Sequence, residues 1–558
     1  MSRQKKRGSL SWVVLLGVGL LVMLISCGSC YLVYQVAQRD RPETLGGNDA
    51  VLRVAYSPDK QELFAELVKR FNAGRVKTAN GKRIAIEASP VEAEVMLSAA
   101  LAGDFDALCP DSSIWLAQLD LDWQAQQQSE TSIVGDTARF AVSPVVIAMW
   151  RDTAQSMGYP DRGIGWMSLL EAARTNPDFR WSHPSTSSAS GLLATLAVFY
   201  AGAGKTRGLT VEDVTRESTL NYVATLEKTV RYYGEGESAV IQQVEQKGRS
   251  YLDAFVVQEQ LLIRFNQRNS DKLVAVYPVE GATWADHPLV FLERPEVSSE
   301  QREAFREFRS FVLSAEAQAL VLSAGYRPTD LSIALDTVSS PIKAALGVDP
   351  SQPRTTLQIP GPAVIQVVRD VWQYTKRKTN VYLVADVSGS MQGEQLEQAQ
   401  EAFQAFLGMI KGEQERVGLI VFSSSEAEVE PLAELGTNRA RLEGQIAGLY
   451  AGGDTALLDA VNLAYDRLQQ LQDTERINAI VVMTDGKENN SSIRLRDLTA
   501  KMRRVNQSGV PVVVFCVAYG SDADTDTLEQ LSSATGGQTR RGSTQTIQEL
   551  YKLLSTYF

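Results

Sequence analysis

The sequence predicts an α/β protein with mainly parallel sheets, divided into more than one domain. From residue 51 onward, short apolar runs of strand type alternate with stretches whose apolar residues recur at helical spacing. This alternation is typical of folds in which helices pack against parallel sheets. The length of 558 residues exceeds one ordinary domain, and a long apolar run near the N-terminus precedes the alternating region. We therefore expect several globular units behind one apolar segment.

The bulk composition argues against two classes of protein. Hydrophobic residues make up 44% of the chain and charged residues 22%, as in ordinary globular proteins. The net charge of −11 argues against a broad nucleic-acid-binding surface, so no nucleic-acid partner is expected. The 4 cysteines are too few for a disulfide scaffold. Cys109 and Cys516 fall in different expected domains and are predicted to be buried thiols.

The apolar run at residues 10–36 predicts a single transmembrane helix that anchors the protein. A basic segment, residues 1–9, precedes it and should stay in the cytoplasm. Residues 37–50 then form a polar spacer, and the later domains lie outside the cell membrane. The alternative is a lipoprotein signal, since Leu24-Ile-Ser-Cys27 resembles a bacterial lipobox with Cys27 as the lipidated residue. Both interpretations tether the protein to the outer face.

A two-lobed module is expected to fill residues 51–335. Residues 51–137 alternate strand and helix, and residues 139–150 form a long apolar run broken by Pro144 that suits a crossing between lobes. The expected first lobe comprises residues 51–137 and 260–335, and the second comprises residues 138–259.

Four stretches of this module share a pattern with a known family. They are residues 51–58, 182–191, 277–288 and 311–328, and the first of them reads Val-Leu-Arg-Val-Ala-Tyr-Ser-Pro. Together they resemble the bacterial extracellular solute-binding proteins. The resemblance covers about half of the chain and implies a periplasmic-binding-protein-like module of type II, whose lobes close over a ligand.

Hydroxyl side chains near the expected strand ends and helix starts are the candidate ligand contacts of this module. Hydroxyls beside free amides at helix starts suit a small polar or anionic solute. Ordinary helix capping is the alternative for each residue taken singly. The candidates are Tyr56, Ser57, Ser112, Ser113, Ser143, Thr186, Ser187 and Ser188.

Catalytic motifs are absent from the sequence, so we expect no enzyme. No Gly-x-Ser-x-Gly elbow, phosphate-binding loop or Cys/His zinc pattern occurs. His183 and His287, the 2 histidines of the chain, each precede a proline. They are interpreted as loop residues at the rim of a cleft or as structural residues, with a shared metal or acid–base role as the alternative.

The last unit, residues 379–558, follows a proline-rich linker and a helix at 336–378. One apolar strand run, Val381 to Ala385, ends in Asp386-Val-Ser-Gly-Ser, and another ends at Asp485. Thr455 stands where a loop leads into a helix. Because the carboxyl ends of parallel strands meet at one edge of a sheet, we expect these side chains to lie together. Their oxygens suit a hard divalent cation. The five candidates are Asp386, Ser388, Ser390, Thr455 and Asp485.

This set resembles the metal-ion-dependent adhesion site of the von Willebrand factor type A domain. The resemblance implies a Rossmann-like doubly wound fold and Mg²⁺, Mn²⁺ or Ca²⁺ as the cofactor. It also implies an open coordination position that a carboxylate of a protein partner completes. Capping and turn formation are the alternative role for each residue alone.

Combined, these features predict a membrane-anchored extracytoplasmic binding protein. A type A domain would bind a protein partner through a divalent cation, and a solute-binding-like module would accompany it. The alternative is a substrate-binding component associated with an ABC-type transporter.

Overall fold

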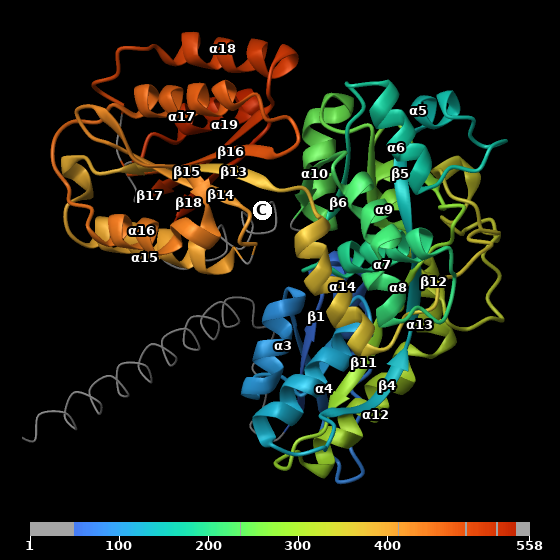
Figure 1. Cartoon of the computed structure of the whole chain (residues 1–558). Helices are drawn as coiled ribbons and strands as arrows, with labels where there is room; N and C mark the ends of the chain where they lie inside the picture. The colour runs from blue at the N-terminus through green and yellow to red at the C-terminus, as the bar shows by residue number, and fades with distance from the viewer. Residues whose placement is uncertain (1–48, 235, 411, 486–487, 520–522, 543–558) are drawn as a thin grey trace, which may run out of the picture.

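The computed structural model of the chain describes residues 49–542, apart from residues 235, 411, 486–487 and 520–522. Three sheets organise this part, each covered by helices (Figure 1), so the predicted α/β class is confirmed. Among these residues, no helix is both long and apolar enough to span a bilayer. The expected anchor at residues 10–36 and the lipidation candidate Cys27 lie outside the described residues.

The first lobe is built on a 5-stranded sheet in the order β2-β1-β3-β11-β4. β1 runs parallel to β2 and β3, whereas β11 runs antiparallel to β3 and β4. One face of the sheet packs against α2, α12 and α13, and the other against α3 and α4. The elements are β1 (Ala50–Tyr56), α2 (Gln61–Ala73), β2 (Ile84–Pro90), α3 (Ala93–Ala102), β3 (Ala107–Cys109), α4 (Ile114–Gln127), β4 (Val134–Arg139), β11 (Pro288–Leu292), α12 (Ser299–Val312) and α13 (Ala315–Ser323).

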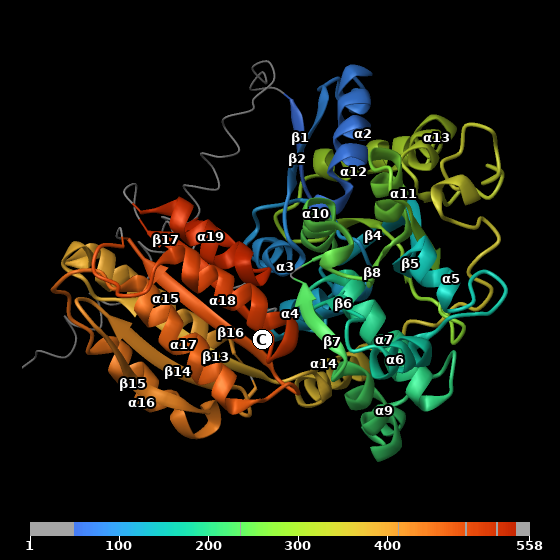
Figure 2. The same ribbon diagram turned by 90° about the horizontal axis from the view of Figure 1, so that it is seen from above.

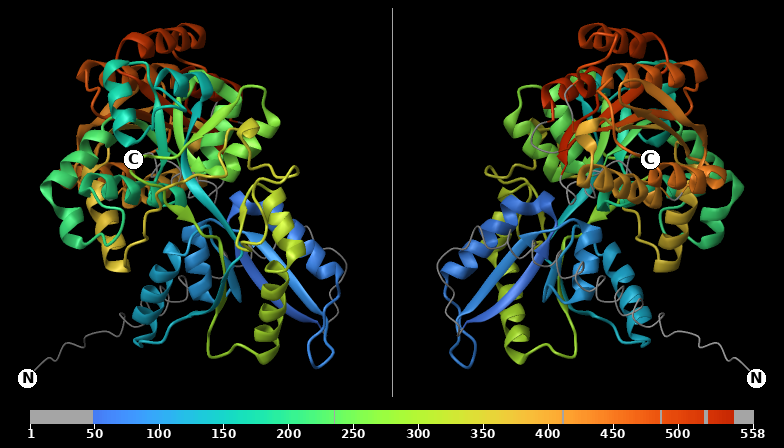
Figure 3. Two further views of the ribbon diagram at one scale, coloured as in Figure 1. Left: turned by 90° about the vertical axis from the view of Figure 1, so that its right-hand side faces the viewer. Right: turned by 90° about the vertical axis from the view of Figure 1, so that its left-hand side faces the viewer.

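The second lobe contains a 7-stranded sheet that includes the path β10-β5-β8-β6-β7, with β9 and β12 also paired to β5. Figure 3 shows it above the first lobe, with the long β5 rising into it. The strands are β5 (Ala141–Trp150), β6 (Trp181–Pro184), β7 (Val230–Gly234), β8 (Ala254–Gln258), β9 (Leu273–Val276), β10 (Trp284–Ala285) and β12 (Arg327–Pro328). The helices are α5 (Arg151–Ser156), α6 (Trp166–Thr175), α7 (Ala189–Ala203), α8 (Val211–Thr215), α9 (Glu217–Glu227), α10 (Glu237–Lys247) and α11 (Glu259–Arg268).

The expected return of the chain to the first lobe at residue 260 is wrong. β9 and β10 pair with β5 in the second sheet, and the chain rejoins the first sheet only at β11. Apolar periodicity identified these segments as strands, but the partner of a strand is set by contacts with distant residues, which periodicity does not contain. The chain therefore returns from the second lobe to the first at β11, later than the sequence suggested.

The connecting helix α14 (Pro362–Thr375) packs on the second lobe. Its buried residues Val368 and Trp372 recur at helical spacing, and the Trp372 ring lies 5.1 Å from that of Tyr233. Proline at the start of the helix suits a position whose N–H needs no helical acceptor. Figure 2 shows α14 between the lobes and the C-terminal unit.

The C-terminal unit contains a 6-stranded sheet in the order β15-β14-β13-β16-β17-β18, parallel except for β15. Along β13, Val381 and Leu383 face α15 and α16, whereas Tyr382 and Val384 face α17 to α19. The elements are β13 (Thr379–Asp386), α15 (Glu394–Met409), β14 (Arg416–Phe422), β15 (Glu426–Glu434), α16 (Leu435–Ala447), α17 (Leu457–Leu471), β16 (Ile477–Thr484), α18 (Leu495–Ser508), β17 (Val512–Tyr519), α19 (Thr525–Thr535) and β18 (Thr539–Gly542). The sheet is thus doubly wound, with β13 at the point where the strand order reverses.

Direct hydrogen bonds attach this unit to the second lobe. The Arg377 guanidinium donates to the carbonyl of Val230 at 2.9 Å and to that of Thr474 at 2.6 Å. The Lys247 ammonium donates to the carbonyl of Gly536 at 2.8 Å. Arg377 therefore bridges the lobe and the C-terminal sheet immediately after α14.

Candidate functional site

Three loops meet at the carboxyl edge of the C-terminal sheet, beside the strand β13. The first follows Asp386, the second leads into α17, and the third follows β16. The Gly389 N–H donates to the carbonyl of Gly453 at 2.9 Å, and the Gly452 N–H donates to that of Val387 at 2.8 Å. These bonds hold the first two loops side by side. The edge is the place where doubly wound sheets bind ligands.

Four of the five predicted metal residues are linked at this edge by hydrogen bonds. The Asp386 carboxylate accepts from the Ser388 N–H at 2.8 Å, and the hydroxyls of Ser388 and Ser390 lie 3.1 Å apart. The Ser390 hydroxyl donates to Asp485 at 2.7 Å, although the two residues are separated by 95 positions. The structure therefore gathers these oxygens from two different strand ends.

Thr455 lies in the second loop and does not cap the following helix. α17 begins after Ala456 without a side-chain cap, and the Thr455 hydroxyl makes no hydrogen bond within the described residues. Its N–H donates to the Asn489 side chain at 2.9 Å, and its hydroxyl remains available as a ligand. Capping, the alternative role for Thr455, is excluded by this geometry.

Polar residues just after Asp485 support the site and were missed in the sequence. The Glu488 carboxylate accepts from the Leu458 N–H at 3.1 Å, and Ser491 accepts from the same N–H at 3.0 Å. They satisfy the first turn of α17 in place of Thr455. The Thr484 hydroxyl donates to the second oxygen of Asp386. The polar run Glu488-Asn-Asn-Ser-Ser after an apolar strand was the signal that could have identified them.

The Asp386 carboxyl group is 1% exposed, and this burial raises its pKa. Hydrogen bonds from Ser388 and Thr484 oppose the rise, and the nearby charge of Asp485 adds to it. Two carboxylates and three hydroxyls with no nitrogen or sulfur atom are the donor set that hard divalent cations prefer. The residues present therefore fit such an ion.

The hydroxyl candidates of the first module are divided between two lobes. Ser57 follows β1, Ser112 and Ser113 follow β3, and Ser143 lies on β5. Tyr56 is 4% exposed and stacks on Phe64, with ring centroids 4.7 Å apart, so it belongs to the core of the first lobe.

The remaining hydroxyl candidates lie in the loop between β6 and α7. Ser188 caps α7 by accepting from the Gly191 N–H at 3.1 Å, Ser187 donates to Ser185 at 3.2 Å, and Thr186 is buried. Capping thus accounts for Ser188, and ligand contact by the other hydroxyls stays a prediction.

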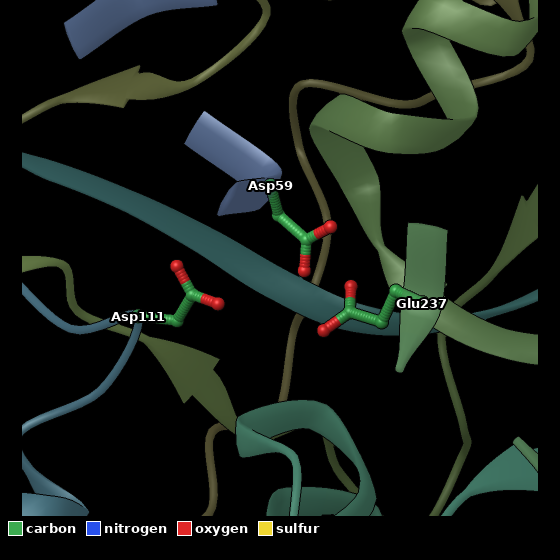
Figure 4. Close-up of side chains that lie close together, drawn as sticks. All are labelled: Asp59, Asp111 and Glu237. Atoms are coloured by element: carbon green, nitrogen blue, oxygen red, sulfur yellow. The ribbon is translucent and has the colours of Figure 1, made fainter. Parts of the chain in front are cut away.

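Carboxylates, which the sequence did not single out, lie between the lobes. Asp59 and Asp111 belong to the first lobe and Glu237 to the second, and one oxygen from each lies within 4.8 Å of the others (Figure 4). The Ser238 hydroxyl, from the second lobe, donates to Asp59, and the Ser190 hydroxyl donates to Glu237. Only the packing of the two lobes brings these positions together.

Burial and mutual repulsion act on this cluster. Burial and the charge of Asp111 raise the pKa of Asp59 to about 7. Burial and the charges of Asp59 and Asp111 raise the pKa of Glu237 to about 8. Burial also acts to raise the pKa of Asp111, but the Lys60 ammonium, 3.2 Å away, and His287 together outweigh burial and hold that pKa below its usual value. Repulsion of this kind is relieved by a proton or by a bound cation.

The histidines are buried and separate, which excludes a shared site. His183 is 1% exposed, and its Nε2 lies 3.2 Å from both carboxylate oxygens of Glu227. His287 is 0% exposed and lies beside Asp111. The interpretation of His183 as structural is supported by its ring contact with Tyr233, at 5.1 Å between centroids. Cys109 and Cys516 are free and buried, so that prediction is confirmed.

Protein stability is expected to fall as pH rises through the pKa of His183. Burial disfavours the imidazolium, but the charge and hydrogen bond of Glu227 outweigh burial and raise the pKa of His183. The contribution of the pair is therefore complete below a pH of about 6.5 and is lost above the raised pKa. Thermal unfolding between pH 6 and 9 measures this slope.

The Glu227→Gln variant is expected to flatten the dependence of stability on pH, because its neutral amide does not stabilise the charged imidazolium of His183. Glu217→Gln, an exposed position on the same helix α9, is the control and should keep the wild-type slope. An unchanged slope in Glu227→Gln would contradict the assignment to His183.

Comparison with known proteins agrees with the division of the chain. Residues 52–327 match the family model of bacterial extracellular solute-binding proteins, and residues 380–552 match that of the von Willebrand factor type A domain. The human inter-alpha-trypsin inhibitor heavy chain H4 is 29% identical over 176 residues, 30% of this chain and 18% of that protein. An uncharacterized protein of Mycobacterium tuberculosis is 24% identical over 305 residues, 51% of this chain and 42% of that protein. The chain thus spans less than half of either relative.

Solved structures similar to the chain include proteins of both kinds. The sulfate-binding protein SubI from Mycobacterium tuberculosis H37Rv is 19% identical, with a TM-score of 0.37, and covers 51% of this chain and 89% of its own. The von Willebrand factor type A protein from Catenulispora acidiphila is 19% identical, with a TM-score of 0.29, and covers 32% of this chain and 42% of its own. From the two family matches, the chain joins a bacterial extracellular solute-binding domain, residues 52–327, to a von Willebrand factor type A domain, residues 380–552.

Proposed function

We propose that the chain is a membrane-anchored extracytoplasmic binding protein whose type A domain holds a divalent cation and, through it, a protein partner. The observation that carries the proposal is the Ser388–Ser390–Asp485 hydrogen-bond chain, which gathers oxygen ligands from separate loops. The hydroxyl of Thr455, which makes no hydrogen bond within the described residues, supports it. The match to the type A family supports it independently.

The chain's own residues define what such a site does. Ser388, Ser390 and Thr455 offer hydroxyl oxygens, and Asp386 and Asp485 offer carboxylates for direct or water-mediated contact. The hydrogen bonds from Thr484 and the Ser388 N–H fix the orientation of Asp386 before any ion binds. The cation, when bound, supplies an electrophilic position that a carboxylate of a partner completes. Nothing in this arrangement requires a chemical reaction.

The outward location of the type A domain rests on the N-terminal sequence. Residues 10–36 are apolar and follow a basic segment, which is the pattern of an anchor whose C-terminal side leaves the cytoplasm. The solute-binding family is extracellular by its description, in keeping with that orientation. A partner carboxylate on the outer face would then reach the metal edge.

Magnesium binding to the purified chain tests the proposal. Asp386→Ala is expected to weaken Mg²⁺ binding at the type A site by at least about tenfold, because it removes a carboxylate that two neighbouring residues orient. Asp454→Asn is the matched control, since Asp454 is an exposed neighbour of Thr455 outside the proposed ligand set. Isothermal titration calorimetry measures both, and equal Mg²⁺ affinity in the two variants would refute the site.

The transport alternative rests on the first module, whose family gathers extracellular solute-binding proteins. It requires a tight small-molecule ligand, which a thermal-shift screen of the full chain would reveal. Adhesion through the type A domain requires only the cation and an acidic partner. If the chain binds a protein partner but no small molecule stabilises it in the screen, the transport alternative is excluded.

A further inference from the structure

We propose that Asp59, Asp111 and Glu237 form a second divalent-cation site, which spans the two lobes of the solute-binding domain. It is independent of the type A site and goes beyond the proposed adhesive function. One oxygen from each carboxylate lies within 4.8 Å of the others, a spacing that one ion can bridge. Figure 4 shows the side chains converging from three separate segments.

The three carboxylates stand at strand ends of both lobes. Asp59 follows β1 and Asp111 follows β3, neighbouring parallel strands of the first sheet. Glu237 follows β7 and begins α10 in the second lobe. The carboxyl ends of strands are where open α/β sheets bind ligands, and here two such edges face each other. The cluster thus occupies the position at which the fold places a ligand.

The local charge favours a cation over an anion. The Lys60 ammonium is 0% exposed, and its three N–H groups are used by the carbonyls of Cys109 at 2.9 Å and Pro110 at 2.7 Å and by Asp111 at 3.2 Å. No donor of Lys60 remains for an anionic solute. When all three carboxylates are ionised, the Lys60 ammonium balances one of their charges and leaves two, the charge that one divalent cation balances.

His287 provides an observation that is independent of the carboxylates. Its ring is 0% exposed, and neither ring nitrogen makes a hydrogen bond within the described residues. Nδ1 lies 3.5 Å from the Asp111 oxygen that pairs with the Lys60 ammonium at 3.2 Å. Buried polar atoms are otherwise nearly always paired, so these orphaned atoms point to an absent partner. Carboxylates with one imidazole fit a first-row divalent ion.

The site would also join the lobes. Asp59 already accepts a hydrogen bond from Ser238 across the lobe junction. An ion shared by Asp59, Asp111 and Glu237 has ligands on both sides, so its binding favours the closed arrangement over an open one. The spacing of the oxygens, within 4.8 Å of one another, suits a single ion between them.

Manganese binding to the full chain tests the inference, with the free Mn²⁺ signal read by electron paramagnetic resonance. The Asp386→Ala chain, whose type A site is impaired, is expected to retain one bound Mn²⁺. Adding Glu237→Gln in the second lobe should weaken this binding by at least about tenfold, and Asp59→Asn in the first lobe should do the same. Glu245→Gln, exposed on the same helix α10, is the matched control and should bind as before.

The outcomes separate this site from the type A site. Equal Mn²⁺ binding by Glu237→Gln and Glu245→Gln overturns the inference, as does loss of all binding in Asp386→Ala alone. Displacement of Mn²⁺ by an alkyl diamine at equal concentration overturns it in favour of an amine site. Thermal unfolding in chelator shows whether each variant folds, and a stable Glu237→Gln chain without Mn²⁺ binding supports the inference.

Discussion

Replacing Gly191 by alanine is expected to destabilise the solute-binding domain by about 3 kcal/mol. A Cβ at this position would lie 1.9 Å from the carbonyl oxygen of Ser185 and 2.4 Å from that of Pro184. Both obstacles are backbone atoms, so no side-chain rotation relieves the overlap. The loop between β6 and α7 must shift and with it the Ser188 cap of α7. Denaturant unfolding of the full chain measures the loss.

Gly202→Ala on the same helix is the matched control. There a Cβ meets only side-chain atoms, the nearest being that of Tyr222 at 3.0 Å, and these can move. We expect a change of less than about 1 kcal/mol, because alanine also gains helix propensity over glycine. Similar losses in the two variants would show that the close approach at Gly191 is not the cause.

Glu415→Ala is expected to destabilise the type A domain and its junction with α14 by about 3–5 kcal/mol. Glu415 is 0% exposed and accepts hydrogen bonds of 2.6 Å from both the N–H and the hydroxyl of Thr379. Its other oxygen lies 3.7 Å from the Lys376 ammonium, which is 5% exposed as a residue. The substitution leaves a buried positive charge and two donors without acceptors. Chemical denaturation measures the effect.

The double variant Glu415→Gln with Lys376→Met separates the charge from the hydrogen bonds. The glutamine keeps an acceptor for Thr379, and the methionine removes the stranded charge, so much of the stability should return. Glu413→Ala, exposed two residues away, is the control and should change stability little. A double variant no more stable than Glu415→Ala would contradict the role of Lys376.

The meeting of the oxygen-bearing loops at one edge of the type A domain was predictable because each of its parts is local. The buried run from Val381 to Ala385 and the second run to Thr484 identify parallel strands, and the side chains at their ends follow directly in the chain. The side of the sheet on which the loops meet follows from the fold class. The sequence analysis missed Glu488 and Ser491. They accept hydrogen bonds from the backbone of α17, and the pattern of side chains along the chain does not reveal such a contact.

In the solute-binding domain, the sequence singled out hydroxyl residues and did not single out the carboxylates that the structure brings together. The hydroxyls of Ser57 and Ser112 lie within two positions of Asp59 and Asp111, so the loops were identified but their carboxylates were not. In sequence, a single aspartate after a strand looks like a cap or a turn residue. Only its closeness to Glu237, a residue of the other lobe, distinguishes such an aspartate from a cap or a turn residue.

The sequence by itself determined the α/β class, the order of the two domains and the five oxygen-bearing residues of the type A edge. Each depends on residues close together in the chain or on the periodicity of one segment. The tertiary structure decided which sheet β9 and β10 join, that α14 packs on the second lobe, and that Asp59, Asp111 and Glu237 converge. These features arise from contacts between distant segments, whose energies depend on packing and burial that local sequence does not encode.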